Sequence, residues 1–364
     1  MIASKTMRIE KQFLMYRGGS LDSPTIAYET WGTLKGEGDN AILIFSGLSP
    51  SAHASSSPED SSAGWWEEMI GPGLPVDTNR FFVICVNSLG SCFGSTGPAS
   101  VDPGTGSLYR LSFPVLSLED VAESAFEVLK ALRVKKLNTI IGCSMGGMTA
   151  LAFCAQHSGF SDQMISISSA TEALPFAIAV RSLQREMICK DSKWNQGNYD
   201  VDDPPVIGQR LARKLGMMTY RSAVEWEHRF AREEAANKNG GNQFYGDFAV
   251  ESYLENHANK FSGQFDANCY LYLSRASDLF DFSQHGGTLE AGFSRLKLKR
   301  CLVIGVQSDI LFPIHQQKKL VDDLSRVVND LQFKELDCIK GHDSFLVEMD
   351  EFCPVIHDFL TFAE

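Results

Sequence analysis

The chain has 364 residues, 44% of them hydrophobic, which predicts one large α/β domain with an insertion, or two small domains, around a sizeable core. Its formal net charge is −12 and its pI is about 5.2. We therefore expect neither nucleic acid nor an anionic membrane as a partner, since either would need a basic patch that works against the overall field.

The first half of the chain alternates segments typical of strands with segments typical of helices. Helical spacing of apolar residues predicts a helix over 117–134, with Ser117 as its N-cap and two acidic residues in the first turn. Short apolar runs separated by such crossovers indicate a mostly parallel sheet covered by helices on both faces. The strands are expected over 25–32, 40–49 and 80–90, and the segment 135–147 leads from a further strand into a helix.

The pattern changes to long helical stretches in the middle of the chain and then changes back. Helices are predicted over 176–190, 207–231 and 248–261, separated by the polar stretches 191–205 and 236–247. Strand-like runs return within 299–313 and 330–348, and a last helix is expected over 351–362. This order predicts a core made of 1–174 and 296–364, interrupted by an all-helical lid insertion over 175–295.

The cysteines and the N-terminus point to a reducing compartment. Nine cysteines, an odd number, occur mostly in apolar runs and without a C-x-x-C pair, which favours reduced, buried thiols over a disulfide framework. The first residues, MIASKTMRIEKQF, have no continuous apolar stretch behind their positive charges, and no apolar run reaches membrane-spanning length. We expect a soluble, cytoplasmic protein without a bound metal.

One serine stands between small residues where a predicted strand becomes a helix, in Gly142-Cys143-Ser144-Met145-Gly146. Such a sharp turn holds its central residue in strained φ/ψ, and the glycines let strand and helix approach closely. The serine hydroxyl would project at the carboxyl end of the sheet. The pattern indicates a nucleophile, although similar turns also occur for purely structural reasons.

A serine hydroxyl is a weak nucleophile, so it needs a base, and the base needs an orienting carboxylate. After strands late in the chain, Asp309 follows one apolar run and His342 follows the next. We therefore predict a triad of Ser144, Asp309 and His342, in preference to Asp343 as the acid, because adjacent loop residues rarely form the supporting pair. The oxyanion would be held by the main-chain N–H groups of Met145 and Leu48, the latter in the loop after an early strand.

Six stretches resemble a known family in order and across nearly the whole chain. They are AYETWGTL, GWWEEMIGPGLPVDTNRFFVICVNSLGSCFGSTGPAS, GCSMGGMTAL, ARKLGMMTYRS, SDILFP and GHDSFL. They are similar to the α/β-hydrolase-fold O-acyltransferases that act on homoserine or serine. The resemblance implies an α/β-hydrolase core with a helical lid, a homodimer formed through lid helices, and ping-pong acyl transfer from an acyl-coenzyme A. It implies no permanently bound cofactor.

The same resemblance assigns the acceptor site. It implies that Arg213 and Asp343 bind the amino acid, with Tyr220 nearby. The chemistry agrees, because a free amino acid presents a carboxylate to a guanidinium and an ammonium to a carboxylate. From the residues alone, Arg213 would be a solvated charge on a helix face.

The loop after the early strand departs from the usual homoserine acetyltransferase pattern. It reads Leu48-Ser49-Pro50-Ser51-Ala52-His53 in place of a Leu-Thr-Gly-Asp type sequence. This variant is most similar to the branch that transfers succinyl groups to serine, so we expect Ser49, Pro50, Ser51 and Ala52 to set specificity. Pro50 would stiffen the loop and narrow the pocket.

The donor and the reaction leave alternatives open. A succinyl donor has a distal carboxylate that needs a cation, for which Arg181 and Arg185 are candidates, with surface solvation as the alternative for at least one of them. The expected function is serine O-succinylation in cysteine biosynthesis. The alternatives are acetylation or succinylation of homoserine in methionine biosynthesis, a carboxylesterase-type hydrolase, and a catalytically silent binding module. Serine and homoserine differ by one methylene, which is worth only about 1 to 3 kcal/mol in an apolar pocket.

Overall fold

A twisted sheet runs through the centre of the molecule. The computed structural model describes residues 5–235, 244 and 246–361, and within them eight strands pair in the order β1-β4-β8-β5-β9-β10-β11-β12. β1 and β4 are antiparallel to their neighbours, and the remaining pairs are parallel. The strands are β1 Lys5–Arg8, β4 Thr25–Trp31, β5 Ala41–Phe45, β8 Phe82–Val86, β9 Leu137–Cys143, β10 Ser161–Ile167, β11 Arg300–Val306 and β12 Asp330–Leu336.

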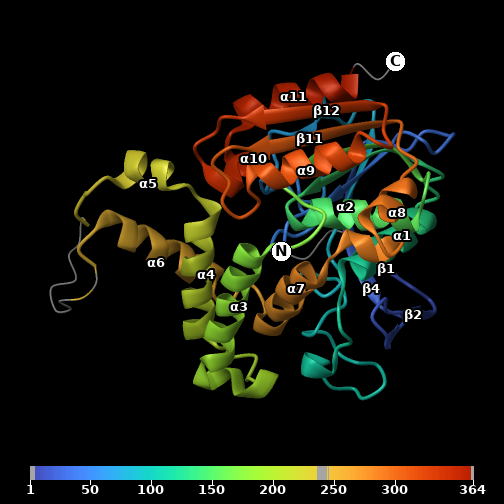
Figure 1. Cartoon of the computed structure of the whole chain (residues 1–364). Helices are drawn as coiled ribbons and strands as arrows, with labels where there is room; N and C mark the ends of the chain where they lie inside the picture. The colour runs from blue at the N-terminus through green and yellow to red at the C-terminus, as the bar shows by residue number, and fades with distance from the viewer. Residues whose placement is uncertain (1–4, 236–243, 245, 362–364) are drawn as a thin grey trace.

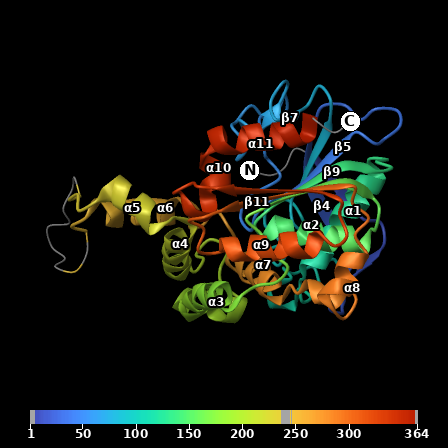
Figure 2. The same cartoon turned by 45° about the horizontal axis from the view of Figure 1, so that its top comes forward.

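The central strands are apolar on both sides, as expected for a parallel sheet that is covered on both faces. Successive residues face opposite sides: Leu43 and Ile140 belong to one apolar cluster, whereas Ile44 and Ile141 belong to the other. The first cluster packs against α1, α2 and α9, and the second packs against α11 (Figures 1 and 2). These helices are α1 Leu118–Ala131, α2 Met145–Gln156, α9 Ile314–Leu324 and α11 Met349–Thr361.

The predicted helix at 117–134 is confirmed, including its cap. The Ser117 side chain accepts from the Asp120 N–H, and the Asp120 carboxylate accepts from the Ser117 N–H, which completes a capping box. The expected parallel sheet is also present, although the strand predicted at 25–32 is antiparallel to both neighbours. Two small additional sheets pair β2 Gln12–Leu14 with β3 Ser20–Asp22, and β6 Ile70–Gly71 with β7 Val76–Asp77.

Between β10 and β11 the described chain is helical. We refer to α3–α7 as the lid helices; α5 and α6 project away from the sheet (Figures 1 and 2). η3 Phe282–His285 and α8 Leu289–Ser294 also fall within 175–295, but they pack against α2 and α9 of the core. The lid helices are α3 Pro175–Lys190, α4 Val206–Tyr220, α5 Ala223–Phe230, α6 Ala249–Phe261 and α7 Ala267–Leu279.

The long helix expected over 207–231 is wrong, because the chain breaks at Arg221–Ser222 into α4 and α5. Arg221 is extended, and the Ser222 side chain caps α5 by accepting from the Glu225 N–H. The polar stretch expected over 236–247 lies mostly outside the described residues. No helix in the described part of the chain is long and apolar enough to cross a membrane.

All nine cysteines lie in the described part of the chain and are free thiols.

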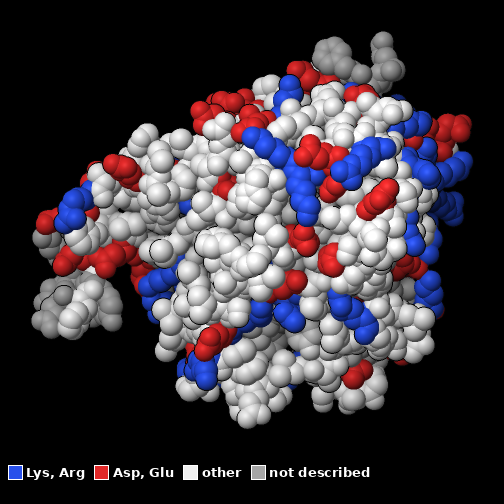
Figure 3. Space-filling model, in the orientation of Figure 1, with Lys and Arg blue, Asp and Glu red and all other residues white. Residues whose placement is uncertain are grey.

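On the face seen in Figure 3, acidic and basic side chains are interspersed. The net charge of −12 is therefore not gathered into a single acidic patch on that face.

Candidate active site

Ser144 occupies a sharp turn between β9 and α2. Its φ is +57° and its ψ is −121°, a conformation that costs a non-glycine residue energy. The flanking strand β9 and helix α2 approach closely, since a Cβ on Gly142 would lie 2.3 Å from the Gly146 oxygen. Helix α2 also lies against the end of β5, since a Cβ on Gly146 would lie 2.1 Å from the Phe45 carbonyl oxygen. The two glycines thus permit the turn that presents the serine hydroxyl.

Three side chains from separate loops form one hydrogen-bonded row. The Ser144 Oγ lies 2.8 Å from His342 Nε2, and His342 Nδ1 lies 2.7 Å from Asp309 Oδ2. The other Asp309 oxygen accepts from the N–H groups of Leu311 and Phe312 at 2.9 and 2.8 Å. The loops after β9, β11 and β12 therefore bring the predicted nucleophile, acid and base together at the carboxyl end of the sheet.

The environment of His342 raises its basicity. Phe312 stacks on the imidazole at 5.2 Å between ring centroids, and the ring is almost fully buried. Burial lowers the pKa of His342, but the charge and hydrogen bond of Asp309, with a contribution from Asp343, outweigh it and raise the pKa above 6.5. The raised pKa makes the imidazole a stronger proton acceptor for Ser144.

The two residues predicted to supply main-chain donors lie beside the serine. Leu48 and Met145 both line the pocket that contains Ser144. Neither of their N–H groups donates a hydrogen bond to any residue that the structure describes. Met145 is also the first residue of α2, where the helix dipole favours negative charge. These two groups are thus free to receive a developing oxyanion.

The predicted specificity loop divides into two parts. Ser49 and Pro50 line the pocket, whereas Ser51 and Ala52 do not. The Ser51 carbonyl accepts from the indole N–H of Trp65 at 3.0 Å, and Ala52 is fully buried. Ser51 and Ala52 therefore contribute to the placement of the loop and do not contact the cavity.

A buried ion pair anchors this loop to the sheet. His53 Nδ1 lies 2.9 Å from the carboxylate of Glu29 on β4, and both side chains are at most 3% exposed. His53 Nε2 contacts the Ser62 carbonyl at 2.9 Å. Burial lowers the pKa of His53, but the hydrogen bonds to Glu29 and Ser62 and the nearby carboxylates raise it above 6.5 overall. The loop that carries Leu48 is thereby fixed from its far end.

Glycines let helices α3 and α4 pack closely against each other. A Cβ on Gly208 of α4 would lie 2.5 Å from the Met187 carbonyl of α3, and one on Gly216 would lie 2.8 Å from Gln184 Nε2. Gln184 in turn donates to the Ala212 carbonyl at 2.9 Å. This close packing directs side chains of both helices toward the same cavity.

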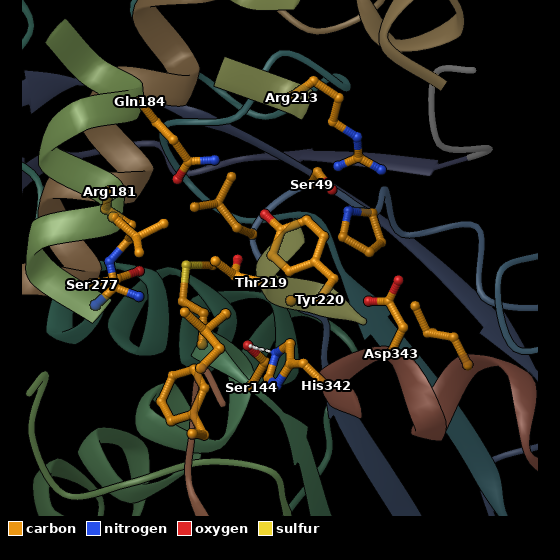
Figure 4. A pocket seen from close by; sticks show the side chains of 18 of the residues that line it. Ser49, Ser144, Arg181, Gln184, Arg213, Thr219, Tyr220, Ser277, His342 and Asp343 are labelled. Carbon is orange, nitrogen blue, oxygen red and sulfur yellow. Dashed lines mark hydrogen bonds between the residues drawn. The ribbon is translucent and has the colours of Figure 1, made fainter. Parts of the chain in front are cut away.

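The resulting cavity has a volume of about 140 Å³ and is shown in Figure 4. The loops of the core and three lid helices surround it. Arg181 and Gln184 come from α3 on one side, and Arg213 and Asp343 lie on the other side, with Tyr220 between them (Figure 4). The lining residues are Gly47, Leu48, Ser49, Pro50, Ser144, Met145, Val180, Arg181, Gln184, Arg213, Thr219, Tyr220, Tyr270, Ser277, Leu311, Phe312, His342, Asp343, Phe345 and Leu346.

Arg213 is a cation in this cavity without a carboxylate partner in the described part of the chain. Its guanidinium lies 4.6 Å from the ring centre of Phe261 and 5.6 Å from that of Tyr220. Its Nε is buried and has no hydrogen-bond partner among the described residues. The aromatic rings hold the charge in place while its hydrogen-bonding edge is left for a ligand.

Asp343 supplies a negative charge on the same side of the cavity. Its Oδ2 lies 3.4 Å from Nε of Arg221 at the break between α4 and α5. Burial raises the pKa of Asp343 above 3.8, and Arg221, His342 and Arg213 limit the rise. An ammonium group placed beside Asp343 would stabilise its ionised form.

The loop that carries His342 packs tightly against the break between α4 and α5. Gly341 has a φ of +73°, and a Cβ there would lie 2.8 Å from the Ser222 nitrogen. The Ser222 hydroxyl donates to the Ile339 carbonyl. The loop that carries the predicted base therefore contacts the chain at the break between α4 and α5.

The two arginines predicted for an acyl carboxylate have different positions. Arg181 lines the cavity, but Arg185 does not. Both pair with buried Asp278 of α7: Arg181 Nε lies 2.6 Å from Oδ1, and Arg185 Nη2 lies 2.6 Å from Oδ2. Arg185 therefore lies outside the cavity that contains Ser144, and its side chain is 16% exposed, whereas that of Arg181 is 8% exposed.

Several lining residues were not predicted from the sequence. Gln184, Thr219, Tyr270 and Ser277 have no local pattern that marks them, since their role depends on which lid helices meet. Asp278 had one usable signal, because two arginines on one buried helix face require a nearby acid. In the described part of the chain, no group of three or more His, Cys, Asp or Glu side chains could hold a metal ion.

The sheet order, the strained serine turn and the row of Ser144, His342 and Asp309 are those of an α/β-hydrolase. A family model for the alpha/beta hydrolase fold matches residues 6–348, and the chain belongs to this family. Within it, the chain is 54% identical over 349 residues to a serine O-succinyltransferase from Litchfieldella anticariensis, with 95% of each protein covered. It is 51% identical over 350 residues to a serine O-succinyltransferase from Stenotrophomonas maltophilia, with 96% of this chain and 95% of that protein covered.

Solved structures give a less specific answer. The homoserine O-acetyltransferase from Bacillus anthracis superposes with a TM-score of 0.90 at 26% identity, covering 99% of this chain and 98% of that one. Esterase E22 superposes with a TM-score of 0.89 at 27% identity, covering 99% and 100%. The same backbone therefore occurs in an acyltransferase and in an esterase, so the reaction must be argued from the side chains of the pocket.

Proposed function

We propose that the chain is an acyl-coenzyme A-dependent O-acyltransferase that converts succinyl-CoA and L-serine into O-succinyl-L-serine and CoA, as a step toward cysteine. One observation carries this proposal: a nucleophile shares a small cavity with two incompletely compensated arginines and a carboxylate. Water as the acceptor would need none of these charges.

The charges of the cavity match the two substrates. Arg213 has no acidic partner in the described part of the chain, and Arg181 shares a single carboxylate with Arg185. Arg213 therefore contributes about one excess positive charge to the cavity, and Arg181 with Arg185 contributes about one more. In the proposed complex, Arg213 binds the serine carboxylate, Arg181 binds the distal succinyl carboxylate, and Asp343 binds the serine ammonium. An acetyl donor would leave the excess positive charge that Arg181 and Arg185 share over Asp278 uncompensated.

The first half-reaction forms an acyl-enzyme. His342 Nε2 takes the Ser144 proton, and Ser144 Oγ attacks the thioester carbon of succinyl-CoA. The Leu48 and Met145 N–H groups hold the oxyanion, which collapses as the carbon–sulfur bond breaks. CoA leaves as the thiol with the proton from His342, and succinate remains as an ester on Ser144.

The second half-reaction transfers the acyl group. Serine binds with its carboxylate on Arg213 and its ammonium on Asp343, which directs its hydroxyl toward the acyl carbon. His342 removes the hydroxyl proton, the new ester forms, and the proton returns to Ser144 Oγ as the enzyme ester breaks. The lid helices limit the access of water, so transfer competes with hydrolysis.

The assembly and location are part of the proposal. We place the enzyme in the cytoplasm, where acyl-CoA is its co-substrate and no prosthetic group is bound. We expect a homodimer paired through the lid helices, because Leu183 of α3 and Ile207 and Leu211 of α4 expose apolar side chains beside one another. We treat the unit 175–295 as a lid whose last part, η3 and α8, rests on the core.

The test is CoA release by the purified enzyme with four donor and acceptor pairs: succinyl-CoA or acetyl-CoA, each with serine or homoserine. We expect the highest kcat/KM with succinyl-CoA and serine, and little CoA release beyond one equivalent without an acceptor. A preference for homoserine would replace the acceptor and keep the reaction class. Sustained release without any acceptor would identify a hydrolase, the alternative that the structural similarity to esterase E22 keeps in view.

A further inference from the structure

Asp278 lies between two arginines in the interior of the lid helices. Its side chain is 1% exposed, and its two oxygens pair separately with Arg181 and Arg185 of α3. One carboxylate therefore compensates two guanidinium groups, and the cluster retains a charge of about +1. A buried charge of this kind is costly unless it is paired or reserved for a ligand.

Arg181 is the member of this cluster that lines the cavity. Its Nε is committed to Asp278 at 2.6 Å, while its Nη2 is buried and has no hydrogen-bond partner among the described residues. Arg181 lines the cavity with Ser144, and Ser277, the neighbour of Asp278 on α7, lines it too (Figure 4). The guanidinium of this lining residue is thus held through Nε and keeps one buried nitrogen, Nη2, without a partner among the described residues.

Arg185 supports Asp278 from outside the cavity. It is one helical turn beyond Arg181 and does not line the cavity, and its Nη1 lies 3.4 Å from the Ser274 hydroxyl. Through the second oxygen of Asp278 it holds the carboxylate in place. It also prevents Asp278 from cancelling the whole charge of Arg181.

We propose that Asp278, held by Arg185, is a positioning residue that orients Arg181 toward the distal carboxylate of the acyl donor and so sets the preference for a dicarboxylic acyl group over acetyl. This inference rests on the proposed function. It adds two residues that do not touch the donor but determine which donor is used. If Asp278 only held α3 and α7 together, its loss would change kcat/KM for both donors equally.

The decisive variant is Asp278→Asn, which keeps the shape of the side chain and removes its charge. The experiment measures kcat and KM with succinyl-CoA and with acetyl-CoA at saturating serine. We expect the ratio of kcat/KM values, succinyl over acetyl, to fall roughly 10- to 100-fold, mainly through the KM for succinyl-CoA. A purely electrostatic role predicts the opposite, because the variant has more positive charge and should bind succinyl-CoA more tightly.

Glu255→Gln is the matched control. Glu255 of α6 is also a carboxylate between two cations, Arg210 and Lys214, but it does not line the cavity. Its loss should leave the donor ratio unchanged. The proposal is overturned if folded Asp278→Asn also keeps the wild-type ratio of kcat/KM values, as it would if kcat/KM fell equally for both donors.

Arg185→Gln keeps the proposal testable if Asp278→Asn does not fold. In that variant Asp278 loses the group that holds its second oxygen, so it no longer orients Arg181 and the donor ratio should again fall. An unchanged ratio would contradict the proposal. The wild-type enzyme tests the proposed donor separately from the role of Asp278. If it does not prefer succinyl-CoA, the proposed donor is wrong; if it does and the variants keep that preference, only the role of Asp278 is wrong.

Discussion

Replacing Arg213 with methionine removes one cation from the cavity and keeps much of the packing. Methionine can still contact Phe261 and Tyr220, whose rings lie 4.6 and 5.6 Å from the guanidinium. The variant loses the charge-assisted hydrogen bonds to the serine carboxylate, which are worth about 1.5 to 3 kcal/mol. Because each 1.4 kcal/mol corresponds to about a factor of ten, we expect kcat/KM for serine to fall about 10- to 150-fold.

The two half-reactions allow this loss to be located. Arg213 acts on the acceptor, so the burst of CoA released from succinyl-CoA in the absence of serine should keep its amplitude and rate. Rapid-quench measurement of the burst, together with steady-state rates over a range of serine concentrations, separates the two steps. A variant that loses the burst as severely as the serine dependence would refute the assignment, because Arg213 would then act on the donor or on the fold.

A control on the same helix excludes a general effect of losing a charge from α4. Arg210 pairs with Glu255 and does not line the cavity. Arg210→Met should change kcat/KM for serine by less than about twofold, since partly exposed ion pairs contribute about 1 kcal/mol or less. An equal loss in both variants would mean that the packing of α4, and not the charge at position 213, controls the acceptor step.

Three further predictions concern the nucleophile, the base and the loop beside them. Ser144→Ala should abolish the CoA burst and turnover while the melting temperature stays near that of the wild type; retained turnover would exclude Ser144 as the nucleophile. Protonated His342 cannot accept the serine proton, so kcat/KM for the donor should fall as the pH drops through the raised pKa of His342, with a midpoint above pH 6.5. A midpoint at or below pH 6.5 would contradict the conclusion that the surroundings of the imidazole raise its pKa. His53→Gln leaves Glu29 buried without its partner, which should lower the unfolding free energy by about 3 to 5 kcal/mol and lower kcat because the Leu48 N–H is misplaced. Denaturant unfolding and steady-state kinetics measure these two effects. A loss of unfolding free energy below about 1 kcal/mol would show that the pair does not anchor the loop.

Local patterns predicted the parts of this protein that depend on neighbours in the chain. The strand-to-helix turn at Ser144 needs small residues beside it, and the cap at Ser117 needs a polar oxygen, so both are visible in the sequence. The order of the loops that carry Asp309 and His342 follows from the strands that precede them. The specific resemblance to acyltransferases added Arg213, whose helix alone gives no sign of a buried site.

Contacts between distant segments could not be predicted in the same way. α7 is buried on most sides, so its sequence, ANCYLYLSRASDL, lacks the polar face by which an amphipathic helix is recognised. Asp278 therefore remained unnoticed, although it pairs with both arginines that the sequence had singled out. The break at Arg221–Ser222 is a different case, because Ser222 followed by Glu225 is a local pattern typical of a helix start. Helical spacing continues across the break and hides this pattern, and the packing of Gly341 against Ser222 adds a contact that the local sequence does not show.

That packing also limits how the protein could be redesigned. A lid segment transplanted from a relative would bring its own version of Tyr220–Ser222 to a recipient loop, 339–341, that allows no added Cβ at Gly341 and offers one carbonyl to the Ser222 hydroxyl. A mismatch of a few tenths of an ångström at this junction would displace the imidazole as well as the acceptor site. Chimeras intended to change the acceptor should therefore exchange the α4–α5 junction and the histidine loop as a single cassette.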